Sequence, residues 1–262
     1  MISIGKVEKY LLNKIKDEGA IHLSLLDPLE VPMSEICEVV LDIANAGSSA
    51  IMVGGSTLAD PYGLKEFVSK IKDQINLPVI LFPNNISSII PNVDAIWFMS
   101  LLNSTNPYYI IGAQMLGAPI VKKYNIEPLP MAYLILGEGG TAGFIGDAKP
   151  IPYNKPEIVT AYALAARYLG LRFIYLEAGS KAIKPVPTTV ISAVKHEVPE
   201  AVLIVGGGIR TGKTAFEIVK AGADIVVTGT IVESRELRVK YLKEIVKGVK
   251  DAARAKLHKS SK

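Results

Sequence analysis

Three stretches decide the fold, and they read Phe173-Ile-Tyr-Leu-Glu-Ala-Gly-Ser180, Val202-Leu-Ile-Val-Gly-Gly-Gly-Ile-Arg210 and Asp224-Ile-Val-Val-Thr-Gly-Thr230. Each is a short apolar run that ends at glycine, which is typical of a buried parallel strand followed by a tight loop. Two consecutive glycine loops of this kind at one end of a barrel form the usual phosphate site of a (β/α)8 protein. The stretches therefore predict a barrel that binds a small phosphorylated molecule.

The rest of the chain alternates strand and helix patterns in the same way. Eight strands are predicted, as a closed parallel barrel requires, at 20–26, 50–53, 78–82, 95–100, 131–136, 172–177, 201–205 and 224–228. Helices are predicted at 34–46 (with Ser34 as N-cap), 61–74, 107–116, 156–169, 187–195 and 211–220. With 262 residues, we expect one α/β domain over residues 1–262, a single (β/α)8 TIM barrel with an N-terminal helix and a basic C-terminal helix.

Two connections depart from the alternation. The segment from 83 to 93 reads Pro-Asn-Asn-Ile-Ser-Ser-Ile-Ile-Pro-Asn-Val, which is too short and too rich in turn residues for a crossover helix. The third helix of the barrel is therefore predicted to be missing or reduced. The segment from Gly137 to Gly146 is a glycine-rich loop after the fifth strand, and it continues irregularly to Tyr153. Because such loops rim the active face, we expect it to act as a mobile lid.

Composition indicates an ordinary globular protein with a large core, since 49% of the residues are hydrophobic and 21% are charged. No apolar stretch has the length of a membrane span, and the first residues carry no signal-peptide pattern. Cys37 is the only cysteine, which excludes an internal disulfide and favours a cytoplasmic location. Its neighbours Ile36, Val39 and Val40 predict a buried thiol in the core.

The net charge of +4 is concentrated near the C-terminus. The basic residues there are Arg235, Arg238, Lys240, Lys243, Lys247, Lys250, Arg254, Lys256, Lys259 and Lys262. An apolar stripe at helical spacing accompanies them, made of Leu237, Tyr241, Leu242, Ile245 and Val249. We favour the solvated face of a final helix over the alternative, a weak and transient attraction to an anionic membrane surface. A nucleic-acid partner is not expected, because aromatic interleaving and an arginine cluster are both missing.

Two carboxylates are the candidate catalytic residues. Asp27 follows the first strand, where a carboxylate faces the reaction chamber and offers the oxygen ligands that Mg²⁺ prefers; the alternative is a cap on the turn before Pro28. Ser56, after the second strand, places a hydroxyl beside it. Glu177 ends the sixth strand with Tyr175 on the same side, so it could bind or deprotonate a substrate hydroxyl. The alternative for Glu177 is an ion pair with Lys181 or Lys184.

Other polar and aromatic residues are weaker candidates. His22 lies within the first strand and is interpreted as a satisfied barrel residue, whereas His196 and His258 belong to surface helices. We interpret the residues from Trp97 to Met99 and from Tyr108 to Ile111 primarily as core residues. The alternative is that they form the walls of an apolar channel.

Taken together, six motifs resemble geranylgeranylglyceryl phosphate synthase, the archaeal prenyltransferase that forms the first ether bond of membrane lipids. They are Asp27-Pro28, Val53-Gly-Gly-Ser56, Phe98-Met-Ser-Leu-Leu-Asn-Ser104, Gly137-Glu-Gly-Gly-Thr-Ala-Gly143, Tyr175-Leu-Glu-Ala-Gly-Ser180 and Val205-Gly-Gly-Gly-Ile-Arg210. The resemblance runs from the first strand to the last helix. It implies a TIM barrel whose third helix is replaced by irregular chain, in agreement with the short connection at 83–93.

The resemblance also implies substrates and site residues. Geranylgeranyl diphosphate would be bound with Mg²⁺ through Asp27 and Ser56, and it would be joined to sn-glycerol 1-phosphate. The residues implied for glycerol phosphate are Tyr175, Leu176, Glu177, Ala178, Gly179, Ser180, Lys181, Gly206, Gly207, Thr228 and Gly229. Leu29-Glu30 replaces the Asp-Lys that is frequent in relatives, Lys181 replaces an expected Gly, and Thr228 replaces a common Asn.

Three alternatives remain open at this point. The same chemistry on a longer chain would make a heptaprenylglyceryl phosphate synthase. A different phosphate-binding barrel enzyme would ordinarily need a Lys, a His or a second carboxylate at the strand ends of the first half, where Asp27 stands alone. A non-catalytic phosphate-sensing barrel would not need Asp27 and Glu177.

The resemblance further implies a homo-oligomer, a dimer or a hexamer, for which Tyr108, Tyr109 and Ile110 would supply apolar surface.

Overall fold

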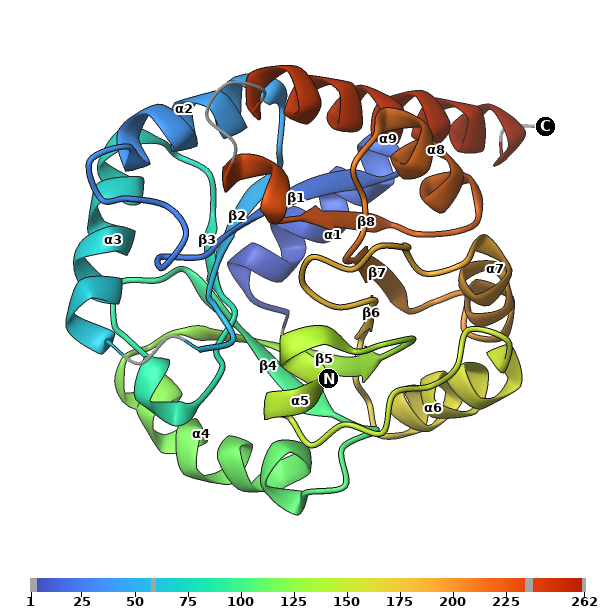
Figure 1. Ribbon diagram of the computed structural model, residues 1–262, viewed down its shortest axis with the longest axis horizontal. Helices are drawn as coiled ribbons and strands as arrows, with labels where there is room; N and C mark the ends of the chain where they lie inside the picture. Colours follow the sequence, from blue (N-terminus) through green and yellow to red (C-terminus); the bar gives the residue numbers. More distant parts are fainter. Residues whose placement is uncertain (1–3, 58–59, 234–237, 261–262) are drawn as a thin grey trace.

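Eight parallel strands close into a barrel at the centre of the computed structural model, which describes residues 4–57, 60–233 and 238–260 (Figure 1). In barrel order the strands are β1 (Ile21–Leu26), β2 (Ala50–Val53), β3 (Val79–Leu81), β4 (Ala95–Leu101), β5 (Glu127–Ile135), β6 (Phe173–Glu177), β7 (Val202–Gly206) and β8 (Ile225–Thr228). The pairing of β8 with β1 completes the ring. The predicted (β/α)8 architecture is confirmed, and each predicted strand matches an observed one.

The strands are apolar on both faces because the barrel has two cores. Alternate side chains fill the barrel interior, among them Leu23, Met52 and Tyr175. The intervening ones, such as Ile51 and Leu176, pack outward against the helices. This explains why the strands appear in the sequence as continuous apolar runs, without the alternation of a half-buried sheet.

Helices surround the barrel (Figure 1). They are α2 (Ile36–Ala46), α3 (Pro61–Gln74), α4 (Ala113–Lys123), α6 (Pro156–Tyr168), α7 (Thr188–Glu197), α8 (Gly212–Lys220) and α9 (Arg238–Ser260). Helix α1 (Lys6–Glu18) lies at the amino-terminal ends of the strands, where the Glu127 carboxylate accepts hydrogen bonds from the Val7 and Glu8 amides, both at 2.8 Å. Glu8 in turn pairs with Arg172, just before β6, so α1 is fixed to the floor of the barrel.

The third barrel helix is reduced, as predicted. Between β3 and β4 the structure has a single 3₁₀ turn, η1 (Ile86–Ser88). The predicted helix at 107–116 begins instead with a π-helical turn, η2 (Tyr108–Gly112), and then continues as α4. The prediction of irregular chain after β5 was partly wrong, because Gly140–Ile145 forms a short helix, α5. Its behaviour as a lid stays a prediction. A last 3₁₀ turn, η3 (Thr230–Glu233), follows β8.

Two predictions at α2 were wrong. Ser34 is not the N-cap, because the helix starts at Ile36 and the residue before it, Glu35, closes a turn onto the Pro32 carbonyl. Cys37 is exposed. The face that packs inward carries Ile36, Val39 and residues at the following helical positions, and Cys37 points away from it.

The C-terminal helix confirms the apolar stripe, since Leu242, Ile245 and Val249 are buried. Arg238 does not belong to the solvated face that the sequence predicted. It is buried, with Nη2 3.0 Å from Glu38 Oε1 and Nε 2.7 Å from Asp42 Oδ2, and so joins α9 to α2. Arg235, Leu237 and Lys262 lie outside the described residues, as do the side chains of His258 and Lys259. Among the helices that are described, none is both long and apolar enough to cross a membrane.

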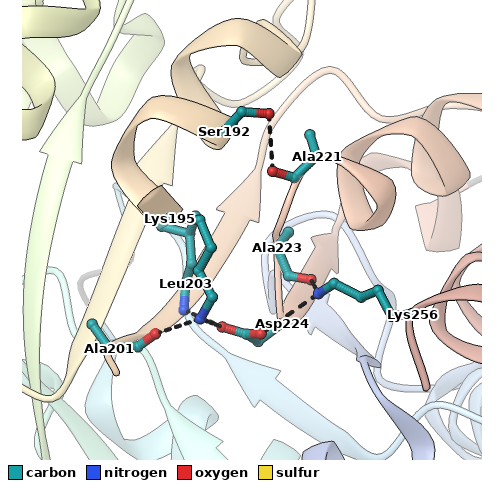
Figure 2. A network of polar contacts seen from close by, with 8 residues as sticks. All are labelled: Ser192, Lys195, Ala201, Leu203, Ala221, Ala223, Asp224 and Lys256. Carbon is teal, nitrogen blue, oxygen red and sulfur yellow. Dashed lines mark hydrogen bonds and ion pairs between the residues drawn. The ribbon is translucent and has the colours of Figure 1, made fainter. Parts of the chain in front are cut away.

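A polar network fastens the amino-terminal ends of β7 and β8 to the helices around them (Figure 2). Asp224 Oδ2 accepts a hydrogen bond from the Leu203 amide at 2.9 Å and lies 2.7 Å from Lys195 Nζ of α7. Lys256 Nζ of α9 lies 3.7 Å from the other Asp224 oxygen and donates to the Ala223 carbonyl. The network therefore belongs to the end of the barrel that ordinarily carries stability.

Candidate active site

A cavity of about 560 Å³ opens at the carboxyl ends of the strands. Loops that follow β1, β2, β3, β6, β7 and β8 contribute to its lining, together with side chains of β4 and β5. Its size is typical of a site for a small molecule, and its place is that of the active site in barrels of this type.

One end of the cavity is formed by the glycine loops. Gly179, Gly207 and Gly208 have positive φ angles of 109°, 83° and 71°, which side chains other than glycine rarely adopt. A Cβ on Gly207 would lie 2.5 Å from Glu177 Oε1 and 2.9 Å from the Gly179 amide nitrogen. These glycines therefore let the loops after β6 and β7 approach each other closely and keep backbone groups at the cavity wall.

Glu177 is buried at the junction of these loops, with 7% of its surface exposed. Its Oε1 accepts a hydrogen bond from the Gly179 amide at 2.6 Å, and the hydroxyls of Tyr175 and Tyr133 also hydrogen-bond to the carboxylate. Burial raises the pKa of Glu177 above its usual value, and these three donors oppose the shift. A carboxylate with a raised pKa in a pocket is suited to accept a proton from a bound hydroxyl.

Glu177 does not form the ion pair with Lys181 or Lys184 that was the alternative interpretation of the sequence. Lys181 Nζ lies 2.9 Å from Glu30 Oε1, across the cavity from its own loop, and Lys184 does not line the cavity. The Tyr175 hydroxyl reaches Glu177 because Gly206 has no side chain, since a Cβ there would collide with that hydroxyl. Phe82 stacks on Tyr175 at 5.8 Å between ring centroids, which fixes the tyrosine in place.

Asp27 lines the cavity and also caps its own turn. The two interpretations of the sequence, a carboxylate that faces the chamber and a turn cap, therefore both hold. Its Oδ1 accepts a hydrogen bond from the Leu29 amide at 2.9 Å. The carboxylate lies against the backbone of Gly55, where any Cβ would collide with it. Burial raises the pKa of Asp27, the Leu29 hydrogen bond and the charge of Lys181 lower it, and the charge of Glu30 raises it further. Ser56 also lines the cavity.

The other end of the cavity is an apolar arm. Ile86, Ile89, Phe98, Met99 and Gly117 contribute to its walls, from η1, β4 and α4. η1 is a single turn where a regular barrel has a full helix, and Ile86 and Ile89 line the cavity from there. Trp97 is fully buried against Phe173, at 5.1 Å between ring centroids, and still borders the cavity. Trp97 and its neighbours therefore have both predicted roles, because they are part of the core and also line the cavity.

Most of the sequence-predicted site residues meet at this cavity. Those that line it are Asp27, Ser56, Tyr175, Glu177, Gly179, Ser180, Lys181, Gly207, Thr228 and Gly229. Three others do not line it. Leu176 and Ala178 pack outward against the helices, and Gly206 lies beneath the Tyr175 hydroxyl.

Sequence reasoning missed several residues that line the cavity, among them Asn85, Gln114, Tyr133 and Arg210. Tyr133 pairs in register with Tyr175 across β5 and β6, so its ring reaches Glu177 from the neighbouring strand. Arg210 lines the cavity, and its guanidinium donates to the carbonyls of Ile183, at 3.2 Å, and Lys181, at 3.4 Å. An arginine two residues after the glycine triplet 206–208 was a usable signal. Tyr133 gave none without the strand register.

His22 is a satisfied barrel residue, as predicted. It is buried, with Nδ1 2.8 Å from Ser48 Oγ and Nε2 2.9 Å from Thr228 Oγ1. Burial lowers its pKa to about 3, so the ring is neutral at physiological pH. Thr228 therefore presents its backbone, and not a free hydroxyl, to the cavity.

Fold and site together define a (β/α)8 barrel protein with its functional cavity at the carboxyl face, closed by glycine loops at one end and extended by an apolar arm at the other. A model of the PcrB family matches residues 13–249. The chain belongs to the PcrB family, and the resemblance to geranylgeranylglyceryl phosphate synthase that the motifs indicated is confirmed.

Curated relatives cover nearly the whole chain. Geranylgeranylglyceryl phosphate synthase of Thermococcus kodakarensis is 53% identical over 253 residues, which cover 95% of this chain and 100% of that protein. The enzyme of the same name from Methanothrix thermoacetophila is 48% identical over 248 residues, which cover 95% and 97%.

Solved structures agree with this assignment. The (S)-3-O-geranylgeranylglyceryl phosphate synthase of Thermoplasma acidophilum, in complex with its substrate sn-glycerol-1-phosphate, superposes with a TM-score of 0.90 at 40% identity and covers 95% of this chain and 100% of its own. Thiamine phosphate pyrophosphorylase from Pyrococcus furiosus, at 13% identity and a TM-score of 0.57, shares the fold alone; the match covers 90% of this chain and 98% of that one.

Proposed function

We propose that the protein is a prenyltransferase that joins geranylgeranyl diphosphate to the C3 hydroxyl of sn-glycerol 1-phosphate and releases diphosphate. The observation that carries this proposal is one cavity with two unlike ends. Glycine loops and a buried carboxylate form the polar end, and an apolar arm extends from it between η1, β4 and α4. The curated relatives of this chain bear the name of that activity.

The polar end would bind glycerol phosphate. Backbone groups of Ser180, Gly207 and Gly229 line the cavity and would hold the phosphate, as the loops of other phosphate-binding barrels do. The Gly179 amide is a weaker candidate than the sequence suggested, because it donates to Glu177. The relative from Thermoplasma acidophilum was solved with this substrate.

Glu177 would accept the proton of the attacking hydroxyl. The bond that forms joins the glycerol oxygen to C1 of the prenyl chain, and the bond that breaks joins C1 to the diphosphate. The leaving group takes both electrons of that bond. A buried carboxylate near C1 would also stabilise positive charge that develops on the allylic carbon. Tyr133 and Tyr175 would hold the carboxylate in position through their hydroxyls.

Asp27 and Ser56 fit a magnesium site of the kind completed by substrate. Among the described residues, there is no group of three or more His, Cys, Asp or Glu side chains that could hold a metal ion. Mg²⁺ is commonly held by only one or two carboxylates together with substrate phosphate oxygens, and Asp27 and Ser56, which both line the cavity, match that donor set. The metal would supply neutralisation of the diphosphate charge. The two residues would position it at the cavity mouth.

The apolar arm would take the prenyl chain. A longer substrate, as in the heptaprenyl synthases, is the second candidate. Gly117 lets Ile89 pack closely against α4 at the wall of this arm, since a Cβ on Gly117 would lie 2.9 Å from Ile89 Cδ1. A cavity of about 560 Å³ that also holds glycerol phosphate favours the shorter, geranylgeranyl chain.

We also propose that the protein is a cytoplasmic homo-oligomer, a dimer or a hexamer. Tyr108, Tyr109 and Ile110 are half-buried, and the exposed large apolar side chains on η2 and α4 are Ile111, Met115 and Leu116. Light scattering at micromolar concentration should give a multiple of the monomer mass of 28.2 kDa, and a monomer would overturn this part of the proposal. Transient contact of the basic helix α9 with an anionic membrane would show as retention on anionic but not neutral vesicles.

One incubation series tests the proposed reaction. The protein, Mg²⁺ and labelled sn-glycerol 1-phosphate are combined with geranylgeranyl diphosphate or with heptaprenyl diphosphate, and label is counted in the organic phase. We expect transfer with the geranylgeranyl substrate to exceed transfer with the heptaprenyl one. Faster reaction with the longer chain would favour the second candidate, and label that stays in water with both would contradict prenyl transfer.

A further inference from the structure

An ion pair crosses the mouth of the cavity. Lys181, in the loop after β6, lies with Nζ 2.9 Å from Oε1 of Glu30, in the loop after β1. Strands β7 and β8 separate β6 from β1 in the barrel, so the two loops come from different sides of the opening. Both side chains line the cavity. The pair therefore stands where a substrate would enter.

The backbone of Lys181 is held in an unusual conformation. Its φ of 60° lies in the left-handed region, which is costly for a residue with a side chain. Arg210 stabilises this conformation by donating to the carbonyls of Lys181 and Ile183. Such strain persists where the surroundings fix it, and it is frequent at ligand-binding positions. Here the strain places a long cationic side chain over the cavity.

The pair is suited to open. The side chain of Lys181 is 57% exposed and that of Glu30 is 43% exposed, and ion pairs this accessible to water contribute little. A phosphate group offers the ammonium a shorter, charge-assisted hydrogen bond to an oxygen of higher charge. Lys181 and Asp27 line the same cavity, and the charge of the ammonium lowers the pKa of Asp27.

We propose that Lys181 is a diphosphate-binding residue that Glu30 holds in reserve. When the prenyl diphosphate enters, Lys181 Nζ leaves Glu30 and bonds to the diphosphate, and the loops after β1 and β6 are released from each other. The backbone of Lys181 stays with the glycerol phosphate loop, so its side chain connects the two substrate sites. This inference rests on the proposed function, because it assumes a diphosphate substrate.

Calorimetric titration with inorganic pyrophosphate in the presence of Mg²⁺ tests the proposal, with sn-glycerol 1-phosphate as the second ligand. Lys181→Met removes the charge and keeps the length of the side chain, and should weaken pyrophosphate binding by about tenfold or more. Glu30→Gln removes the competing partner and should tighten it by about two- to fivefold. Lys184→Met is the matched control, because Lys184 lies in the same loop but does not line the cavity. This variant should bind pyrophosphate with the affinity of the wild-type protein. Glycerol phosphate affinity should be the same in all four proteins.

Each other outcome has a defined meaning. Equal pyrophosphate affinity in Lys181→Met and Lys184→Met would overturn the inference and leave the proposed function intact. Loss of glycerol phosphate affinity alone in Lys181→Met would also overturn it, because the ammonium would then serve the other substrate. Failure of the wild-type protein to bind pyrophosphate, or geranylgeranyl diphosphate itself, would overturn the proposed function together with the inference.

Discussion

Replacement of Glu177 by Gln removes one negative charge and almost nothing else from the cavity. The amide oxygen of Gln can still accept from the Gly179 amide, which now donates to Glu177 Oε1 at 2.6 Å. The tyrosine hydroxyls that contact the carboxylate can rotate to accept from the new amide group. We therefore expect the free energy of unfolding at neutral pH to change by about 1 kcal/mol or less.

Turnover should respond far more strongly. The substitution removes the proton acceptor, an effect of about a hundredfold or more on rate, and it also removes charge that would stabilise the allylic carbon. The affinity for glycerol phosphate should hold, because the backbone groups of Ser180, Gly207 and Gly229 are untouched. The assay is single-turnover ether formation, with the melting temperature and glycerol phosphate affinity measured on the same preparation.

The pH dependence gives the prediction a sign. Because burial raises the pKa of Glu177 above 4.5, the wild-type rate should fall as pH drops through that raised value, and the residual rate of the Gln variant should not. The raised pKa also means that the fold favours the protonated form of Glu177. Ionisation of this residue therefore lowers the stability of the wild-type protein as pH rises from 4.5 to the raised pKa. Normal turnover with a lowered melting temperature in the Gln variant would refute the catalytic role.

The remaining predictions concern other parts of the molecule. Asp27→Asn should keep the hydrogen bond from the Leu29 amide, and hence the melting temperature, while turnover at limiting Mg²⁺ drops by about tenfold or more; unchanged turnover would contradict the metal role. Asp224→Asn should lower the free energy of unfolding by about 2 kcal/mol with catalysis intact, as urea titration and the ether-formation assay can show, because Lys195 loses a charged partner; a loss of turnover in the folded variant would count against a purely structural network. His22, with its pKa lowered to about 3, should confer full stability above pH 6.5 and lose it by about 1.4 kcal/mol per pH unit below that; the same urea series in His22→Gln should lack this component, and parallel curves would contradict it.

Much of the fold could be predicted from the sequence because barrel strands are buried on both faces. Such strands leave continuous apolar runs, and glycine marks the ends of β6 and β7 where two loops meet. The short connection before β4 was equally clear, since eleven residues rich in Asn, Ser and Pro cannot form a crossover helix. The exposure of Cys37 was not clear, because apolar neighbours in sequence lie on a different face of a helix.

The candidate site was predicted in part, for a physical reason. Residues at strand ends, such as Asp27 and Glu177, converge because parallel strands all end at one face. Strand alternation, which puts Tyr175 and Glu177 on one side of β6, also predicts that Leu176 and Ala178 point outward. What the sequence does not contain is the register between strands, through which Tyr133 of β5 reaches Glu177. The burial of Arg238 was likewise not predictable, because it depends on the packing of α9 against α2, where Arg238 pairs with Asp42.

Mass spectrometry of the organic-soluble product tests the central claim most directly. The protein is incubated with Mg²⁺, geranylgeranyl diphosphate and either sn-glycerol 1-phosphate or its mirror image, sn-glycerol 3-phosphate, with released diphosphate counted in parallel. The account predicts one product, the geranylgeranyl ether of sn-glycerol 1-phosphate, with one diphosphate released per ether formed and little product from the mirror image. Diphosphate release without an ether product, or no consumption of either substrate, would contradict it.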